Sequence, residues 1–230
     1  MHAIILAGGF GTRLKSVVAD VPKPLAPVAG RPFLAWLLDA LAKDGVTSVT
    51  LSVHHQWQKI RGYFDAHPPG MPLTYAVEKE PLGTGGAIRF AMKVCQAKTP
   101  AIVVNGDTFV KVDYAALYRQ HCHSGAMLTM VLRQVPDTAR YGEVVVAGDI
   151  IQTFRAGRSG KAGLINAGIY VITPGFFDAY NLAQVFAFEQ DFMIPFVGQI
   201  KPHSYLAEDY FIDIGIPEDY ARAQKELPTV

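Results

Sequence analysis

The residues near the N-terminus have the types and the spacing needed to bind phosphate groups. Gly8-Gly9-Phe10-Gly11 is followed by Arg13 and then by Lys23, which stands between two prolines. Glycines allow positive φ angles and close approach of the backbone, so successive N–H groups can face phosphate oxygens. Arg13 adds a guanidinium fork suited to phosphate, and Lys23 adds a positive charge on a backbone with little freedom. These features predict a cradle for a nucleoside triphosphate.

Two commoner glycine-rich motifs do not fit this stretch. It lacks the Gly-Lys-Ser/Thr ending of an ATPase phosphate loop, and Thr12 to Lys15 supply no third glycine for a dinucleotide-binding fingerprint. A tight turn with solvated charges would explain an isolated Gly-Gly-x-Gly. The proline-rich continuation from Pro22 to Pro32 is too particular for that simpler explanation.

Together, segments 8–14 and 22–34 resemble the signature of the sugar-1-phosphate nucleotidyltransferases, and the resemblance covers nearly the whole chain. The stretches 78–88 and 210–220 are most similar to the branch that transfers guanylyl groups from GTP to D-glycero-α-D-manno-heptose 1-phosphate. The resemblance implies that a nucleoside triphosphate and a sugar 1-phosphate give a nucleotide sugar and pyrophosphate, for surface polysaccharide synthesis. It implies catalytic roles for Arg13 and Lys23. The nucleotide contacts that it implies in the first loop are Leu6, Ala7, Gly8, Gly9, Gly11, Thr12, Arg13 and Lys23.

A second glycine-rich loop, residues 78–87, precedes a helix expected at Ile88–Val94. Small residues at a helix N-terminus favour anions and tolerate a flat ligand at close range. By resemblance this loop encloses the base and ribose, through Gly83, Thr84 and Gly86. Glu78 stands where thymidylyl relatives tend to carry a glutamine that reads the base. A carboxylate only accepts hydrogen bonds, so Glu78 suits the paired N–H donors of guanine better than uracil or thymine.

Two aspartates are candidates for holding Mg²⁺. Asp107 follows an apolar strand expected at Ala101–Val104, and ligands of open α/β sheets lie beyond the carboxyl ends of strands. A lone aspartate there is more often a helix cap, but the resemblance implies a metal ligand. Asp213 lies in an apolar stretch, where a carboxylate is costly unless paired or liganded, and the resemblance implies the second ligand. Asn105 and Gly106 are expected beside the nucleotide.

The sugar site is expected near residues 141–168. Gly142 and Glu143 stand at the entrance of a predicted hairpin, although a turn glycine and an exposed glutamate would explain both without a ligand. Asn166 matches an asparagine-containing strand of the family and is expected to bond sugar hydroxyls. Glu189 is more typical of a first-turn helix carboxylate, and we leave it out of the site.

One family feature is missing from this chain. Relatives usually have Phe-x-Glu-Lys, whose lysine binds the sugar phosphate, whereas this chain has Phe154-Arg155-Ala156-Gly157-Arg158. Arg158 or Lys161 would supply the charge from a shifted position, since Gly157 and Gly160 give the loop freedom. The alternative is that both are solvated loop charges.

Positioning these residues requires an α/β domain. The chain has 230 residues, of which 50% are hydrophobic and 18% charged, so it can bury one sizeable core. Apolar strands alternate with helical patterns, which predicts a Rossmann-like, mostly parallel sheet flanked by helices. Tyr141–Val146 and Ile150–Phe154 predict a small inserted β segment joined at Gly148-Asp149. The expected helices include Phe33–Lys43, Trp57–Phe64, Tyr114–His121, Phe176–Tyr180 and Phe188–Gln199. We assign residues 1–230 to a single nucleotidyltransferase domain.

Composition excludes several other classes of function. The net charge of +1 gives little support for nucleic-acid binding. No apolar stretch approaches a membrane span of about 20 residues, and no signal segment precedes the first strand. Two cysteines are too few for a disulfide framework, which favours a reducing compartment, the cytoplasm. The sequence does not indicate an oligomeric state.

Other readings remain open at the level of sequence. The sugar could be mannose with GTP, or N-acetylmuramate or glucose with UTP or dTTP, because such choices depend on one or two side chains. A non-catalytic sugar-nucleotide sensor would keep the same fold. A dinucleotide oxidoreductase needs an acidic residue at the end of the second strand, which here ends in Val53-His54.

Overall fold

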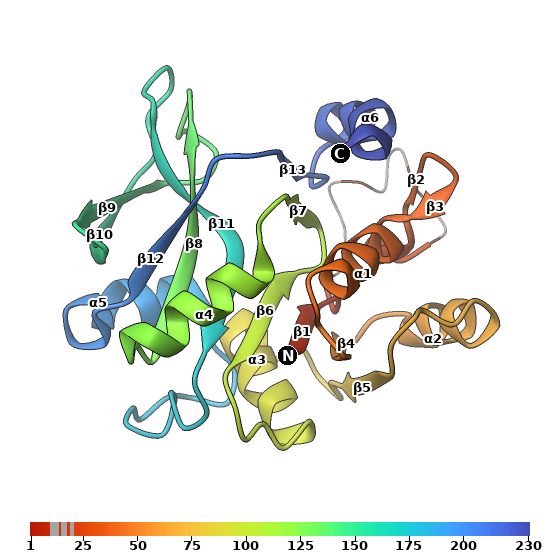
Figure 1. The fold of residues 1–230 in the computed structure, drawn as a ribbon, viewed down its shortest axis with the longest axis horizontal. Coiled ribbons are helices and arrows are strands. Elements are labelled where there is room, and N and C mark those ends of the chain that lie inside the picture. The colour runs from red at the N-terminus through yellow and green to blue at the C-terminus, as the bar shows by residue number, and fades with distance from the viewer. Residues whose placement is uncertain (10–13, 15–17, 19–20) are drawn as a thin grey trace.

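The computed structural model describes residues 1–9, 14, 18 and 21–230. In this part of the chain a nine-stranded sheet carries helices on both faces (Figure 1), in the strand order β5-β4-β1-β6-β11-β8-β12-β10-β9. These strands are β1 (His2–Leu6), β4 (Ser48–Val53), β5 (Leu73–Val77), β6 (Ala101–Asn105), β8 (Leu128–Val135), β9 (Glu143–Ala147), β10 (Ile150–Arg155), β11 (Gly163–Ile172) and β12 (His203–Ala207). Two small ladders lie outside this sheet, formed by β2 (Pro27–Val28) with β3 (Arg31–Pro32), and by β7 (Thr108–Val110) with β13 (Phe211–Asp213).

The helices cover the sheet because apolar residues recur at helical spacing, as the sequence predicts. Helix α1 buries four leucines against one face of the sheet and is followed by Gly45, at φ +87°. That face also holds side chains from α2, α4 and α6, and the opposite face holds those of α3. The helices are α1 (Phe33–Lys43), α2 (Trp57–Ala66), α3 (Gly83–Val94), α4 (Tyr114–Ser124), α5 (Ile194–Ile200) and α6 (Pro217–Glu226), with short 3₁₀ turns at Lys23–Leu25 and Leu227–Thr229.

Strands β5, β4, β1 and β6 form the parallel half of the sheet. Their side chains feed both cores: Ile5 of β1 packs on the α1 face, whereas Ile4 packs on the α3 face. Burial on both faces explains the unbroken apolar run of β1. The carboxyl ends of β1 and β6 therefore lie side by side, at Leu6 and Asn105.

The other half of the sheet is mixed in direction. Strand β11 is antiparallel to both β6 and β8. Strands β9 and β10 form the predicted hairpin, with Gly148 at φ +59°. Because β10 pairs with β12 and β9 contacts β11, the inserted β segment extends the main sheet and is not a separate flap.

Three predicted helices differ from the structure. The helix expected at Ile88–Val94 begins at Gly83, so half of the expected 78–87 loop is helical. Residues 176–180 form turns after Gly175, at φ +82°, because Phe176, Phe177 and Tyr180 pack against Phe192. The expected helix Phe188–Gln199 begins as a π-helical turn, Phe188–Met193, before α5. None of the helices that the structure describes is long and apolar enough to cross a membrane.

Candidate active site

The end of β1 opens into a cavity of about 290 Å³. Its wall brings together the first loop, Lys23, the start of α3 and the end of β6. The residues that line it are Leu6, Ala7, Gly8, Gly9, Lys23, Pro24, Ser52, Glu78, Pro81, Gly83, Thr84, Ala87, Asn105, Gly106 and Asp107. Most of the predicted nucleotide contacts are among them. Gly11, Thr12 and Arg13 lie outside the described residues.

Gly106 allows the end of β6 to approach the end of β1. Its N–H donates to the Leu6 carbonyl at 2.9 Å, and a Cβ on Gly106 would lie 2.5 Å from that oxygen. Only glycine fits so close a backbone approach. This contact sets Asn105 and Asp107 beside the first loop, so the Asn105-Gly106-Asp107 motif has a structural reason as well as a chemical one.

Glu78 is held inside the cavity wall with a fixed orientation. Its side chain is 8% exposed, Ser52 Oγ donates to Oε1 at 2.9 Å, and the Leu82 N–H donates to Oε2 at 3.0 Å. Gly8 passes so close that an added Cβ would lie 3.3 Å from Glu78 Oε1. The carboxylate therefore faces the cavity as an acceptor with its rotamer locked by two donors. Ser52, which the sequence reasoning missed, supplies one of them.

The glycines of α3 serve mainly to admit a distant segment of chain. A Cβ on Gly85 would lie 2.1 Å from the Phe186 ring, and one on Gly86 would lie 2.6 Å from the Gln184 carbonyl oxygen. Gly86 does not line the nucleotide cavity, contrary to our expectation, because its open side accommodates Gln184. Gly83 and Thr84 do line the cavity, and Thr84 Oγ1 accepts a hydrogen bond from the Phe188 N–H at 2.8 Å.

Lys23 crosses the cavity to Asp107. Its Nζ lies 2.6 Å from Asp107 Oδ2, and the lysine side chain is only 11% exposed. Helix α6 supports this segment, because Tyr220 Oη and Gln224 Nε2 both donate to the Pro27 carbonyl, at 2.5 and 2.7 Å. The ion pair of Lys23 and the hydrogen bonds to Pro27 thus hold the proline-rich segment at the first residue of its short 3₁₀ turn and just beyond the turn.

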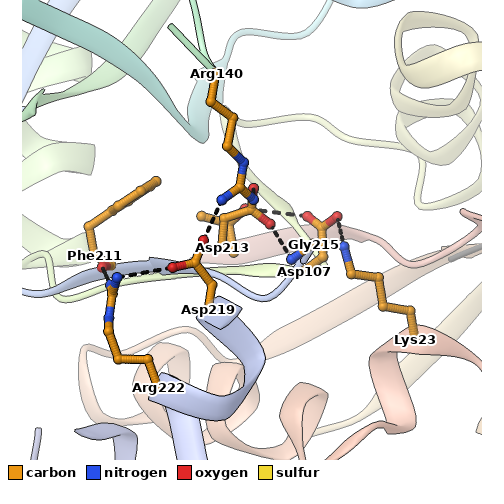
Figure 2. Close-up of polar contacts among 9 residues, drawn as sticks. Lys23, Asp107, Arg140, Phe211, Asp213, Gly215, Asp219 and Arg222 are labelled. Carbon is orange, nitrogen blue, oxygen red and sulfur yellow. Dashed lines mark hydrogen bonds and ion pairs between the residues drawn. The ribbon is translucent and has the colours of Figure 1, made fainter. Parts of the chain in front are cut away.

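The β7–β13 ladder brings the two predicted metal ligands together (Figure 2). Asp213 pairs with Thr108 in this ladder, and the Ile214 N–H donates to the Asp107 carbonyl at 2.9 Å. Burial, and next the negative charge of Asp107, raise the pKa of Asp213 above its usual range. Arg140 and Lys23 oppose this shift. Two close carboxylates that repel each other form an electrostatic site for a cation.

Arg140, which the sequence reasoning passed over, binds the second carboxylate. Its Nη2 donates to Asp213 Oδ2 at 2.5 Å, and its Nη1 donates to Asp219 of α6. Figure 2 shows the guanidinium above Asp213 and Asp219, with Lys23 on the far side of Asp107. The only hint in the sequence was the position of Arg140, directly before the predicted sugar contacts Gly142 and Glu143.

A second cavity, of about 460 Å³, lies on the sugar side. Gly142 and Glu143, which the sequence predicts to contact the sugar, line this cavity, and Arg140 forms part of its wall. Its lining residues are Arg140, Tyr141, Gly142, Glu143, Val144, Phe154, Arg155, Ala156, Gly157, Glu189, Gln190 and Ile194. Asp107 lines the first cavity and Arg140 lines the second, so the carboxylate pair lies where the two cavities approach each other.

Asn166 and Glu189 form one hydrogen-bonded unit beside this second cavity. Asn166 Nδ2 donates to Glu189 Oε2 at 2.8 Å and contacts Tyr170 Oη at 2.7 Å, while its Oδ1 accepts from the Gly168 N–H. From the sequence, Glu189 is left out of the sugar site, because a carboxylate in the first turn of a helix needs no ligand to explain it. It does lie in the first turn of the π-helical segment, but its side chain also lines the cavity.

Arg158 and Lys161, our candidates for the missing charge, do not line the second cavity. Lys161 Nζ lies 3.7 Å from Glu143 Oε1, and the Arg158 N–H donates to Thr138 Oγ1. Contrary to the expectation that Gly157 gives the loop freedom, this residue is closely packed. An added Cβ would lie 1.9 Å from the Thr138 carbonyl oxygen. The loop is packed against residues 138–139.

A glycine-lined cavity beyond parallel strands, with a lysine and an aspartate in its wall, is typical of a nucleotide-binding α/β protein. Residues 2–229 match the family model described as nucleotidyl transferase. The chain is 39% identical over 227 residues to D-glycero-alpha-D-manno-heptose 1-phosphate guanylyltransferase of Aneurinibacillus thermoaerophilus, covering 99% of this chain and 98% of the relative. It is 42% identical over 221 residues to the protein of the same name in Campylobacter jejuni, covering 96% and 97%. The chain belongs to the nucleotidyl transferase family.

Solved structures agree with this assignment. HddC from Yersinia pseudotuberculosis, complexed with GMP-PN, is 35% identical with a TM-score of 0.85 over 98% of each chain. A putative glucose-1-phosphate thymidylyltransferase from Bacillus anthracis has a TM-score of 0.84 at 18% identity, covering 100% of this chain and 96% of that one. The second similarity supports the fold alone.

Proposed function

We propose that this protein transfers a guanylyl group from GTP to D-glycero-α-D-manno-heptose 1-phosphate, releasing pyrophosphate. The observation that carries the proposal is the carboxylate pair Asp107 and Asp213: Asp107 lines the first cavity, and Asp213 accepts a hydrogen bond from Arg140, which lines the second. The names of the Aneurinibacillus and Campylobacter relatives favour this sugar, and the GMP-PN complex of the Yersinia relative favours this base. The product would serve polysaccharide synthesis in the cytoplasm.

The reaction depends more on the alignment of the two substrates than on acid–base catalysis. A phosphomonoester with a second pKa of about 6 is mostly ionised at neutral pH, so no general base is needed. A phosphate oxygen of the sugar 1-phosphate attacks the α-phosphorus in line, the bond to the β-phosphate oxygen breaks, and pyrophosphate leaves. We infer that Lys23 neutralises charge on the triphosphate and that backbone N–H groups of the first loop orient it. Arg13 would contribute from the same loop.

The residues present fit a Mg²⁺ ion. The described residues hold no group of three or more His, Cys, Asp or Glu side chains placed for a metal, so Asp107 and Asp213 would be its protein ligands. Mg²⁺ usually takes one or two carboxylates and fills its other positions with phosphate oxygens and water. The ion would neutralise charge that builds up on the phosphate oxygens during transfer. The pKa of Asp213 is raised first by burial and then by the negative charge of Asp107, and a cation between the two carboxylates would oppose both effects.

Base selection is assigned to Glu78. Ser52 and the Leu82 N–H hold its carboxylate in the cavity wall, where it can accept from the N–H donors of guanine. Uracil and thymine offer a single N–H donor between two carbonyl oxygens, which a carboxylate would repel. This arrangement favours GTP over UTP and dTTP.

A screen of pyrophosphate release tests the proposal. The four nucleoside triphosphates are combined with heptose, mannose, glucose and N-acetylmuramate 1-phosphates, with Mg²⁺ and with a chelator. GTP with the heptose substrate should be fastest, chelation should abolish turnover, and Asp107→Asn should lower kcat roughly a hundredfold. No turnover in any combination would overturn the proposal in favour of a sugar-nucleotide sensor.

A further inference from the structure

Arg140 occupies the wall between the sugar-side cavity and the carboxylate pair. Its guanidinium bonds Asp213 and Asp219 at the same time, stacks 5.0 Å from the centre of the Tyr141 ring, and is 26% exposed. The side chain also lines the cavity of about 460 Å³. The fork is therefore held by two carboxylates and a ring, and the side chain that carries it also borders the cavity.

The second substrate brings a phosphate group, which needs a cation on the sugar side. Among the described residues, the cations that line the two cavities are Lys23, Arg140 and Arg155. Lys23 lies on the nucleotide side, at Asp107. Arg155 is 58% exposed and lies 3.9 Å from Glu143, with no contact to the carboxylate pair in the structure. Of the cations in the described part of the chain, Arg140 is thus the one placed to meet a phosphate that approaches the carboxylates from the sugar side.

Asp213 cannot serve its present partners and a metal ion equally well. Its Oδ2 accepts from Arg140 and its Oδ1 accepts from the Gly215 N–H at 2.7 Å. A divalent cation between the two aspartates would repel the guanidinium and compete for Oδ2. Asp219 would still hold Nη1, so Arg140 would stay nearby with its Nη2 group released.

We propose that Arg140 binds the phosphate of the sugar 1-phosphate, and that a divalent cation frees its Nη2 group for this by displacing it from Asp213. The inference rests on the proposed function and names a phosphate ligand for the same site. In the structure Arg140 pairs with Asp213. With metal bound, Nη2 would turn to the sugar side and donate to a phosphate oxygen while Asp219 keeps Nη1. Metal binding thereby prepares the site for the second substrate.

The test uses Arg140→Gln, with Arg222→Gln as the matched control. Arg222 contacts Asp219 and Glu226 in the same network but does not touch Asp213. The Kd of Mn²⁺ without substrates is measured by electron paramagnetic resonance, and the KM of each substrate is measured by pyrophosphate release. Arg140→Gln should raise the KM of the sugar 1-phosphate roughly tenfold or more and leave that of GTP within about twofold. It should also tighten Mn²⁺ binding about threefold or more, because the competing guanidinium is gone.

Arg222→Gln should change none of these three constants by more than about twofold, since it removes the same charge without freeing Asp213. If Arg140→Gln does not fold, Arg140→Lys keeps the charge without the fork and should raise the KM of the sugar 1-phosphate about three- to tenfold. Unchanged or weaker Mn²⁺ binding in Arg140→Gln, or an equal rise in both KM values, would overturn the inference in favour of a purely structural role. A rise in the sugar KM in Arg155→Gln but not in Arg140→Gln would assign the phosphate to Arg155.

The wild-type screen separates this inference from the proposed function. If another base or sugar proves fastest, the same variants are measured with that pair, and the inference stands or falls on its own. If nothing turns over, the proposed function fails, and the Mn²⁺ measurement still tests the competition at Asp213.

Discussion

Lys23 Nζ lies 2.6 Å from Asp107 Oδ2, so a residue of the proline-rich segment reaches across the cavity to the end of β6. The lysine is largely buried, and its segment is fastened to α6 through the Pro27 carbonyl. This ion pair balances the charge of both groups in the structure. A bound triphosphate would give each of them a new partner: phosphate oxygens for Lys23 and a metal ion for Asp107.

Lys23→Met should lower kcat roughly a hundredfold or more, because a preorganised charge that stabilises the transition state is lost. Arg31→Gln is the control, since Arg31 lies in the same region but pairs with the exposed Asp39 on the outer surface. Pyrophosphate release at saturating substrates gives kcat for both variants. A kcat for Lys23→Met close to that of the wild type would remove this lysine from the catalytic machinery.

Glu78→Gln should reduce the preference for GTP over UTP roughly tenfold, because the amide offers a donor where guanine also offers donors. The measurement is the ratio of kcat/KM for the two nucleotides. Glu80→Gln, an exposed change on the same loop, should leave this ratio unaltered. An unchanged GTP preference in Glu78→Gln would show that another group reads the base.

Gly85→Ala and Gly62→Ala should change the free energy of unfolding in opposite directions. Both glycines lie within helices, but the new methyl group would overlap the Phe186 ring at position 85 and would meet nothing within 4 Å at position 62. We expect a loss of about 1–3 kcal/mol from overpacking in Gly85→Ala. We expect a gain of up to about 1 kcal/mol in Gly62→Ala from helix propensity. Urea midpoints compare the two, and a stabilised Gly85→Ala would show that the Phe186 segment moves aside easily.

His121 should make the fold less stable below about pH 6.5. Burial, with the charge of His203 as a smaller cause, lowers the pKa of His121 to about 4. Its ring nitrogens contact the Thr129 and Thr173 hydroxyls at 2.8 and 2.9 Å. The unfolded chain therefore takes up the proton first, so this contribution is complete above the unfolded pKa and is lost as pH falls towards about 4.

The loss from one proton is at most about 1.4 kcal/mol per pH unit. Urea denaturation from about pH 7.5 down to about pH 5 measures it, with His121→Gln as the comparison. The variant should be less stable at neutral pH but should show a shallower decline on acidification. Parallel declines in both proteins would mean that His121 is not the group that titrates.

Sequence patterns predicted the parts of the fold that depend on neighbours along the chain. The leucines of α1 are a local signal, and this helix spans the residues that the pattern predicts, Phe33–Lys43. The turns at residues 176–180 could not be predicted in this way. Their aromatic side chains have helical spacing, but they pack against Phe192, which is remote in sequence, and this packing decides the backbone conformation.

Sequence reasoning named candidate residues that the structure brings together, such as Lys23 and Asp107, but it passed over residues whose contacts depend on distant segments meeting. Asp107 is a candidate because it follows an apolar strand, and Asp213 because a carboxylate in an apolar stretch is costly unless paired. The resemblance implies the metal-binding role for both. Arg140 was missed because an arginine before a hairpin is ordinary on a surface, and only the β7–β13 ladder brings Asp213 to it. Glu189 was missed because its first-turn position already explained a carboxylate, and its bond to Asn166 of β11 joins segments that are separate in the sequence.

Residues 184–189 cross the start of α3 and link the walls of the two cavities. A change in the residues proposed to select the base would therefore also affect those on the sugar side. Phe186 fills the space left by Gly85, and the next residues bond Thr84 and then place Glu189 in the second cavity. In a chimera that takes only the 78–87 loop from a uridylyl or thymidylyl relative, residues 184–189 would therefore no longer fit the loop against which they pack. Engineering a new nucleotide preference would require transplanting residues 184–189 together with that loop.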